Sequence, residues 1–467
     1  MKKFLTILLL TLISIFSVTP GALAENDRVV EKEGSIPVPV TYEVRKVIIN
    51  LDSYGNLNQP EDLFLDRKGF LYVADTANNR VLKMDTDGKV LESIAGPADK
   101  PYNKPKGIFV DEDGALYVAD SGNKRVIRRS VSGEYDKVYV KPKSSLLSAD
   151  FVFDPQKIYR NSTGILYVSK GISFITIDDA NQFQGYVGAK EVGFDLRRMF
   201  IRLFASRSQR DRIAKVLPVS YNNFVIGPDG FVYATVGNAQ SGQIRKINAV
   251  GKNLYPDQTF GERMMGENGE WIQPSLADIA VDERGIISTI DKATESIYQY
   301  DQEGNMLLAF GDKGEKRGGF LSPSSIVTDE KGNLYISDSK ANNIQIFEPT
   351  NFTRSVHQAV SFYNNGDYKN AMDYWQQVLA IDANYSLAHK GMGKLYYKEE
   401  RWKDSMDEYL LAEDKGGYSR AFREYRHQKF RQYFAVVFFA FIGIVVGFYF
   451  LFLRLKEKSG KIVRELF

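Results

Sequence analysis

Oxygen-bearing side chains recur at one position of a repeated pattern. Six apolar segments each end in a turn, and the residues four positions before these turns are Asp62, Gly107, Asp150, Asn223, Asp278 and Ser325. Carboxylate and amide oxygens are ligands that Ca²⁺ prefers, and they also hydrogen-bond polyhydroxylated molecules. Asp62, Asp150, Asn223 and Asp278 are therefore candidates for a calcium or ligand site, if the fold brings them together. Solvated turn residues are the alternative interpretation.

The turns belong to an internal repeat. The segment Leu71–Val81 matches Leu116–Val126 at an offset of 45 residues, and Leu334–Ile344 is a third clear copy. Weaker copies begin near Gly164, Gly230 and Gly285. Each copy follows an apolar run and a turn, as short antiparallel strands require. A four-stranded unit of about 45 residues is typical of a β-propeller blade.

Six such units predict an all-β, six-bladed propeller over residues 42–350. The last unit, 324–348, supplies only three strands, while residues 44–50 form a spare strand before the first unit. Pairing these two segments closes the ring and leaves no open edge, which matters because unpaired edges promote aggregation. The inner strands of a propeller converge on its axis, so the six positions above should surround one mouth of the axial channel.

The repeated motif resembles the NHL repeat. Tyr-Val-Ala-Asp-Thr/Ser-x-Asn-x-Arg-Val is clear in the first and second units, the sixth is close to it, and Lys170 and Val236 replace the turn aspartate in the third and fourth. The turn aspartates elsewhere are expected only to cap backbone N–H groups; they are Asp75, Asp120, Asp291 and Asp338. The resemblance implies a propeller. Gluconolactonase-like propellers hold an axial metal with carboxylates and an asparagine, a set similar to the one found here.

Histidine and cysteine chemistry are missing from the expected propeller. His357, His389 and His427 all lie beyond residue 350 and are expected on helix surfaces. The propeller therefore has no histidine general base, which counts against the histidine-dependent amidating and streptogramin lyases of the NHL-like group. The chain has no cysteine, which excludes thiol chemistry and disulfides. No catalytic residue is assigned.

A second period follows the propeller. Five pairs of positions lie 34 residues apart: Ala359 and Gly393, Phe362 and Tyr396, Tyr368 and Trp402, Ala371 and Ser405, and Trp375 and Tyr409. Small residues where helices cross, with aromatic residues one turn away, resemble the tetratricopeptide repeat. Residues 352–430 are thus expected to form helical repeats, with 418–430 as a capping helix that continues into a membrane span.

An insertion between the third and fourth units, residues 194–217, predicts a basic amphipathic helix. Leu196, Met199, Phe200 and Leu203 follow helical spacing, and arginines fill the other positions. One interpretation is a helix packed on the propeller with its arginines in water. The other is a docking element for an acidic partner or anionic lipid, formed by Arg197, Arg198, Met199, Phe200 and Arg202.

The two ends predict an exported chain with one membrane anchor. Residues 1–24 have the basic, apolar and small-residue parts of a signal peptide, and residues 25–41 are a linker. Residues 433–453 carry no charge and are long enough to cross a bilayer. The propeller and the helical repeats would then lie outside the cytoplasm, with the tail 454–467 inside. Gly443 and Gly447 form a small-xxx-small pair that could bring two such spans together.

These features favour a non-enzymatic binding or scaffold protein of the cell membrane. The propeller would recognise a ligand or protein, and the helical repeats would couple it to a membrane complex such as a transport system. The formal net charge of +3 gives no support for nucleic-acid binding. The alternative is a metal-dependent, lactonase-like hydrolase that uses the axial carboxylates, with Ca²⁺ as the candidate cofactor.

Overall fold

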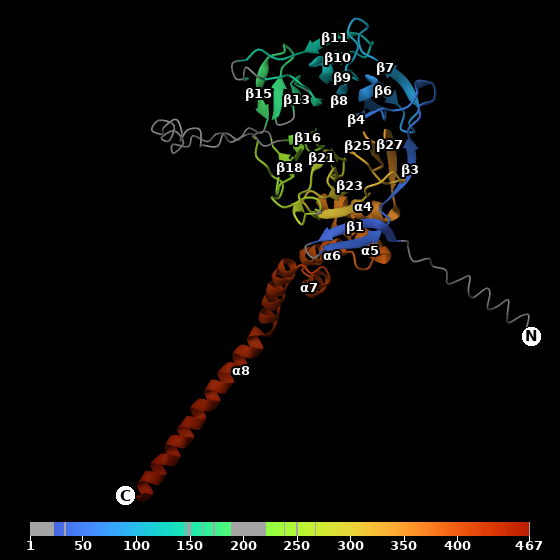
Figure 1. Cartoon of the computed structure of the whole chain (residues 1–467). Coiled ribbons are helices and arrows are strands. Elements are labelled where there is room, and N and C mark those ends of the chain that lie inside the picture. The colour runs from blue at the N-terminus through green and yellow to red at the C-terminus, as the bar shows by residue number, and fades with distance from the viewer. Residues whose placement is uncertain are drawn as a thin grey trace, which may run out of the picture. The chain divides into compact units, whose positions relative to one another are not determined.

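The computed structural model describes residues 23–31, 34–144, 147, 151–161, 163–170, 173–187, 221–237, 239–248, 251–266 and 268–466. These residues form two compact units that divide after Asn365. The first is a six-bladed β-propeller with one helix, and the second is helical. The predicted fold class is therefore confirmed (Figure 1).

Each blade is an antiparallel sheet whose strands follow one another from the axis outwards. The first three blades have four strands each: β4 (Pro60–Leu65), β5 (Leu71–Asp75), β6 (Arg80–Met84) and β7 (Val90–Ile94); β8 (Pro105–Val110), β9 (Leu116–Asp120), β10 (Arg125–Arg129) and β11 (Tyr135–Tyr139); β12 (Lys157–Arg160), β13 (Leu166–Lys170), β14 (Ser173–Ile177) and β15 (Phe183–Val187).

The other three blades depart from this pattern in their outer strands. Their own strands are β16 (Tyr221–Ile226), β17 (Val232–Val236) and β18 (Ile244–Ile247); β21 (Leu276–Val281), β22 (Ile287–Asp291), β23 (Ser296–Tyr300) and β24 (Met306–Phe310); β25 (Pro323–Thr328), β26 (Leu334–Asp338) and β27 (Asn343–Pro349). A separate hairpin, β19 (Met264–Met265) with β20 (Trp271–Ile272), lies between the fourth and fifth blades in sequence.

Aspartate and glycine make the turn after four of the six inner strands. In the first blade, Asp66 Oδ1 accepts hydrogen bonds from the N–H groups of Lys68 and Phe70, at 2.9 and 2.8 Å. Gly69 closes the turn with φ of 79°, a left-handed conformation that a side chain disfavours. This local chemistry explains why the Asp-x-x-Gly spacing marks the blades in the sequence.

The second repeated aspartate has the structural role that the sequence predicts. Asp120 is fully buried and accepts hydrogen bonds from Asn103 N, Asn123 Nδ2 and Arg125 Nε, all at 2.7–2.8 Å. Asp75 makes the same three contacts in the first blade, with Asn58, Asn78 and Arg80. Each aspartate thus fastens the loop before its own inner strand to the turn that begins the third strand.

The ring closes between the two ends of the propeller sequence. Strand β3 (Tyr42–Ile48) pairs antiparallel with β27, from Ile344 opposite Ile48 to Pro349 opposite Tyr42. This is the predicted pairing of the spare strand with the three-stranded last unit. The six inner strands contact one another in order around the axis, β4, β8, β12, β16, β21, β25 and back to β4. Apolar side chains fill the space between neighbouring blades.

Residues 25–41 are not a linker, which corrects the sequence interpretation. Strands β1 (Leu23–Glu31) and β2 (Gly34–Pro39) form a hairpin that adds to β24 and extends the fifth blade to six strands. The Arg28 guanidinium bonds Glu262 at 3.0 Å, and Asp27 accepts hydrogen bonds from the backbone and side chain of Thr41. The hairpin therefore covers the outer edge of this blade, and Pro37 and Pro39 interrupt the new edge.

The helices follow directly. Helix α4 (Asn351–Asn364) belongs to the propeller unit, because Thr350 Oγ1 donates to Val40 O at 2.7 Å and Thr353 Oγ1 donates to Thr41 O at 2.6 Å. The second unit contains α5 (Tyr368–Ile381), α6 (Ser386–Lys398), α7 (Trp402–Leu411) and α8 (Lys415–Leu466). Consecutive helices from α5 to α8 pack on one another.

Helix α8 continues without a break from the helical unit through residues 433–453. Its segment Lys415–Lys456 is long and apolar enough to cross a membrane, and its most apolar window is wholly unburied. Gly443 and Gly447 lie in this helix with open space where a side chain would begin. One candidate membrane span is therefore present in the described chain, as the sequence predicts.

Removing the buried aspartate of a blade turn should be costly. Asp120→Ala leaves the Arg125 guanidinium buried without its carboxylate, so we expect a loss of about 3–5 kcal/mol in the free energy of unfolding. Asp136→Ala in the same blade breaks a partly exposed pair with Arg128 and should cost about 0–1 kcal/mol. Denaturant unfolding of the propeller, followed by intrinsic fluorescence, measures both. Equal losses for the two variants would refute the assigned role of Asp120.

Candidate functional site

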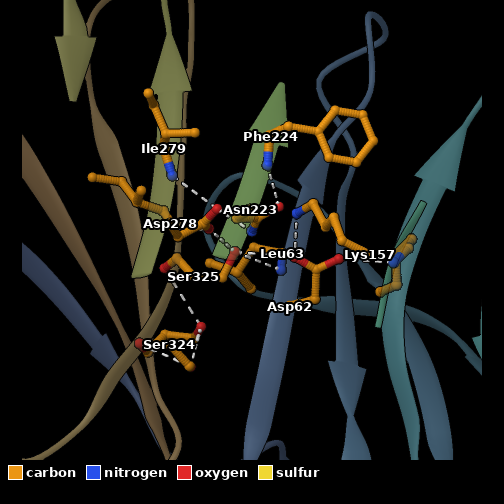
Figure 2. Close-up of polar contacts among 12 residues, drawn as sticks. Asp62, Leu63, Lys157, Asn223, Phe224, Asp278, Ile279, Ser324 and Ser325 are labelled. Atoms are coloured by element: carbon orange, nitrogen blue, oxygen red, sulfur yellow. Dashed lines mark hydrogen bonds and ion pairs between the residues drawn. The ribbon is translucent and has the colours of Figure 1, made fainter. Parts of the chain in front are cut away.

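Inner-strand side chains meet at the propeller axis. Asp62 on β4, Asn223 on β16, Asp278 on β21 and Ser325 on β25 are all buried there, in the arrangement shown in Figure 2. The convergence of these strands follows from the ring of six blades. The structure thus brings together three of the four predicted site residues, while Asp150 and residues 194–217, with Arg197, Arg198, Met199, Phe200 and Arg202, lie outside the described residues.

Lys157 occupies the axial position of the third blade. In the strand ladders Asp62 lies opposite Ala74, Gly107 opposite Ala119, and Lys157 opposite Ser169. Ser169 matches Ala74 and Ala119 in the repeat, so Lys157 takes the place that the sequence interpretation gave to Asp150. The turn that ends this inner strand is Asn161 to Gly164, in which Asn161 Oδ1 accepts from Ile165 N at 2.8 Å.

This position could have been found from the sequence. The third blade uses asparagine where the first two use aspartate at the start of the turn, and Gly164 closes it with φ of 91°. Counting four residues back from Asn161 leads to Lys157. The count that gave Asp150 began instead at Asp154, which precedes the strand.

Asp62 joins the first three blades. Its Oδ2 accepts a hydrogen bond from Ile108 N at 2.8 Å, and its Oδ1 lies 2.5 Å from Lys157 Nζ. The same Oδ1 lies 3.2 Å from Ser325 Oγ of the sixth blade. One carboxylate is therefore in contact with four inner strands, counting its own.

Asp278 joins the other blades. Its Oδ1 accepts from Asn223 Nδ2 and from Ile279 N, the latter at 2.8 Å. Its Oδ2 accepts from Ser325 Oγ at 2.7 Å and from Ile326 N at 2.8 Å. Ser325 Oγ in turn accepts from Leu63 N at 3.1 Å. We call Asp62, Lys157, Asn223, Asp278 and Ser325 the axial network, since together they connect all six inner strands.

The electrostatics of the axial network follow from its burial. Burial raises the pKa of the Asp62 carboxyl, the Lys157 ammonium lowers it and the charge of Asp278 raises it, and the net result is a pKa of about 6. For Lys157, burial alone would lower the pKa of the ammonium, but the two facing carboxylates outweigh that effect and the net shift is upward. Lys157 is thus a cation that pairs with Asp62 and is stabilised further by the charge of Asp278.

The described residues of the axis do not fit a calcium centre. Ca²⁺ takes 6–8 oxygen ligands, whereas both oxygens of Asp62 and of Asp278 already bond N–H, ammonium or hydroxyl groups. Among the described residues, no group of three or more His, Asp and Glu side chains is placed to hold a metal. The arrangement supplies its own counter-charge through Lys157, and calcium binding there stays a prediction.

His357 has a different place from the one expected, whereas His427 is exposed on α8 as the sequence predicts. His357 of α4 is buried rather than on a surface, with Nε2 at 2.8 Å from Gln299 Oε1 of β23. Burial, with a smaller contribution from the Arg284 charge, lowers the pKa of His357 to about 3, so it is neutral and structural. His389 bridges α6 and α7, because its Nδ1 lies 2.7 Å from Glu408 Oε2.

Neutralising the axial cation should destabilise the propeller. Lys157→Met leaves two buried carboxylates without their counter-charge, and we expect it to lower the free energy of unfolding by about 3–5 kcal/mol. Adding Asp62→Asn to that variant removes one of the two anions and should restore part of the loss, a coupling that a double-mutant cycle measures. Lys137→Met, at a partly exposed pair with Asp179, is the matched control and should cost about 1 kcal/mol or less. Additive effects of Lys157 and Asp62 would contradict the network.

Comparisons with known proteins found only distant structural likenesses. No family model and no curated protein sequence matches this chain. Among solved structures, virginiamycin B lyase from Staphylococcus aureus is 13% identical over 65% of this chain and 88% of its own, with a TM-score of 0.39. A gluconolactonase-like protein is 13% identical over 69% of this chain and 98% of its own, with a TM-score of 0.43. Likenesses this distant carry no conclusion about this chain.

Proposed function

We propose that this chain is a membrane-anchored binding protein whose propeller docks a protein partner outside the cytoplasm. The observation that carries this proposal is an exposed apolar hairpin, formed by β19 and β20. The cross-strand pair Met265 and Trp271 is 65% and 60% exposed, and the pair Met264 and Ile272 is 37% and 40% exposed. Tryptophan and methionine are enriched in protein interfaces, and an exposed tryptophan is a common anchor for a partner.

The hairpin is presented from a fixed base. Gly261 N donates to Tyr300 Oη at 2.6 Å, and Glu262 pairs with Arg28 at 2.9 Å. At the turn, Gly266 N donates to Glu270 O at 2.8 Å. Preorganised apolar side chains lose little conformational entropy on binding, which favours recognition. The two strands of the hairpin pair with no other described strand.

The propeller axis has fewer groups available to bind a partner than the exposed hairpin has. Asp62, Asp278 and Ser325 are engaged with Lys157, Asn223 and backbone N–H groups, so a ligand there would have to displace bonds already made. A buried polar group that loses its partner costs about 1–3 kcal/mol. This argument supports binding at the surface of the propeller over chemistry at its axis.

The rest of the chain supports an anchored adaptor. We infer NHL-type blades from the Tyr-Val-Ala-Asp motifs, and a tetratricopeptide-like array from residues that share the 34-residue period and are buried, among them Ala371, Trp375, Ser405 and Tyr409. A signal peptide at residues 1–24 would place both parts outside the cytoplasm, with residues 454–467 inside. The array would then couple the propeller to a membrane complex such as a transport system, and Gly443 and Gly447 could pair two copies.

Removing the apolar hairpin face should release the partner. Met265→Ser with Trp271→Ser deletes one exposed cross-strand pair without touching the core, and we expect the partner recovered with the full-length protein from solubilised membranes to fall tenfold or more. Quantitative mass spectrometry of the purified complex measures this. Val131→Ser with Val138→Ser removes two apolar side chains of the second blade, 68% and 49% exposed, and should leave partner recovery unchanged. Unchanged recovery with the hairpin variant would reject this surface.

The lactonase-like alternative makes the opposite prediction about calcium. A metal-dependent hydrolase should gain roughly 2.7 kcal/mol of stability at a Ca²⁺ concentration 100 times its Kd. Because both oxygens of Asp62 and of Asp278 already bond N–H, ammonium or hydroxyl groups, we expect the unfolding midpoint of the full-length protein to be the same in Ca²⁺ and in chelator. A calcium-dependent rise that is lost in Asp278→Ala would favour the hydrolase, and lactone substrates should then be assayed.

A further inference from the structure

The segment of α8 just before the candidate membrane span is strongly basic. Residues 420–431 contain Arg420, Arg423, Arg426, Lys429 and Arg431 against one acidic residue, Glu424. Glu424 pairs with Arg423 at 3.2 Å. Among the described residues, no carboxylate forms an ion pair with Arg426, Lys429 or Arg431. Three cations nearest the span are therefore without a counter-charge from the protein.

The helix holds these cations at a definite depth. Because α8 is continuous and rises about 1.5 Å per residue, Arg431, Lys429 and Arg426 lie about 3, 6 and 10 Å along the axis before Tyr433, where the uncharged segment begins. The polar interfacial layer on each side of a bilayer is roughly 5–8 Å thick. Long Arg and Lys side chains at these depths reach the phosphate level.

The first turns of α8 are fixed by the helical unit. A side chain at Gly417 would meet the Tyr409 ring of α7 at 2.4 Å, and Ala421 is fully buried. Beyond Ala421 the helix leaves this packing, and Arg426 and Arg431 are exposed. The cations therefore lie between the packed array and the span, on a helix that cannot fold them back onto α7.

Their angular spread distinguishes two ways of meeting a membrane. At 3.6 residues per turn, Arg426 lies about 60° around the helix axis from Lys429 and about 140° from Arg431, and Lys429 and Arg431 are about 160° apart. A helix that lies flat on a bilayer keeps its cations on one face and an apolar face opposite. Cations on all sides suit a helix that enters the headgroup layer end-on, with lipid around it.

Aromatic side chains accompany the cations. Lys429 Nζ lies 5.4 Å from the centre of the Tyr425 ring, and the Arg426 guanidinium lies 6.0 Å from that of Phe422. Phe430 and Tyr433 are more than half exposed. Amphipathic aromatic rings concentrate at the membrane interface. The exposed aromatic rings and the cations without a carboxylate partner therefore both suit the interfacial layer of a membrane.

We propose that Arg426, Lys429 and Arg431 form a binding site for anionic lipid headgroups in the leaflet on the N-terminal side of the span. The proposal rests on the membrane anchoring proposed above and does not depend on which way the helix crosses. Arginine and lysine bind phosphate oxygens through charge-assisted hydrogen bonds. Each cation near an anionic surface contributes about 1 kcal/mol, which corresponds to a preference of up to about fivefold for anionic over neutral lipid.

Full-length protein in vesicles with spin-labelled lipids tests the proposal. We expect the protein to immobilise spin-labelled phosphatidylglycerol several-fold more than spin-labelled phosphatidylcholine, and less so at high salt because exposed charges are screened. Arg426→Gln with Lys429→Gln and Arg431→Gln should bring this ratio close to one. Arg426→Lys with Arg431→Lys keeps the charges and should retain the preference.

A matched control removes the same charge elsewhere. Lys68→Gln with Lys252→Gln and Lys331→Gln changes three exposed lysines of propeller turns and should leave the lipid preference intact. Wild-type protein that enters vesicles with no preference, or a triple α8 variant that keeps it, would overturn the headgroup site alone. Wild-type protein that does not float with vesicles at all would instead overturn the anchoring on which it rests.

Discussion

The ion pair of Lys157 with the buried Asp62 carboxylate is the interaction on which the propeller axis depends. Each inner strand is the edge of its blade, so some of its N–H groups have no partner within their own sheet. The axial side chains provide those partners: Asp62 for Ile108, Asp278 for Ile279 and Ile326, Asn223 for Phe224, and Ser325 for Leu63. Lys157 compensates the charge of Asp62, and four neutral donors hold that of Asp278. Polar residues at the axis therefore have a structural explanation.

The sequence predicts the parts of this fold that local chemistry determines. Asp66 and Gly69 form a turn from their own hydrogen bonds and backbone conformation, and repetition of that turn reveals the blades and the spare strand β3. Lys157 was missed because Asn161 replaces aspartate in the corresponding turn and the count began too early. Asp62 and Asp278 were recognised from their position four residues before a turn. Lys157 has the same position in the third blade, but its turn lacks the aspartate that begins theirs.

Two elements that depend on distant partners were not predicted in their observed places, the β1–β2 hairpin and helix α4. The β1–β2 hairpin has no repeat period, and it exists as a strand pair against β24, about 280 residues away in the sequence. Helix α4 shares the 34-residue period with α6, yet it groups with the propeller, because Thr350 and Thr353 bond the backbone before β3 and His357 reaches Gln299. The 34-residue period predicts which helix positions hold small or aromatic residues. It does not predict whether the helix packs on the propeller or on the other helices.

In the described chain, the exposed apolar side chains and the cations without a carboxylate partner lie away from the propeller axis. The axial network places every charge against a partner, whereas Trp271 and Met265 expose apolar area and Arg426 and Arg431 have no carboxylate. Burial explains the contrast: an unpaired group at the axis would destabilise the fold, while the same group at the surface costs little until a partner covers it. Because the polar groups of the axis are already bonded to one another, a partner is more easily bound by exposed groups at the surface. The hairpin and the helix before the span are therefore the places where sequence changes should alter association without altering the fold.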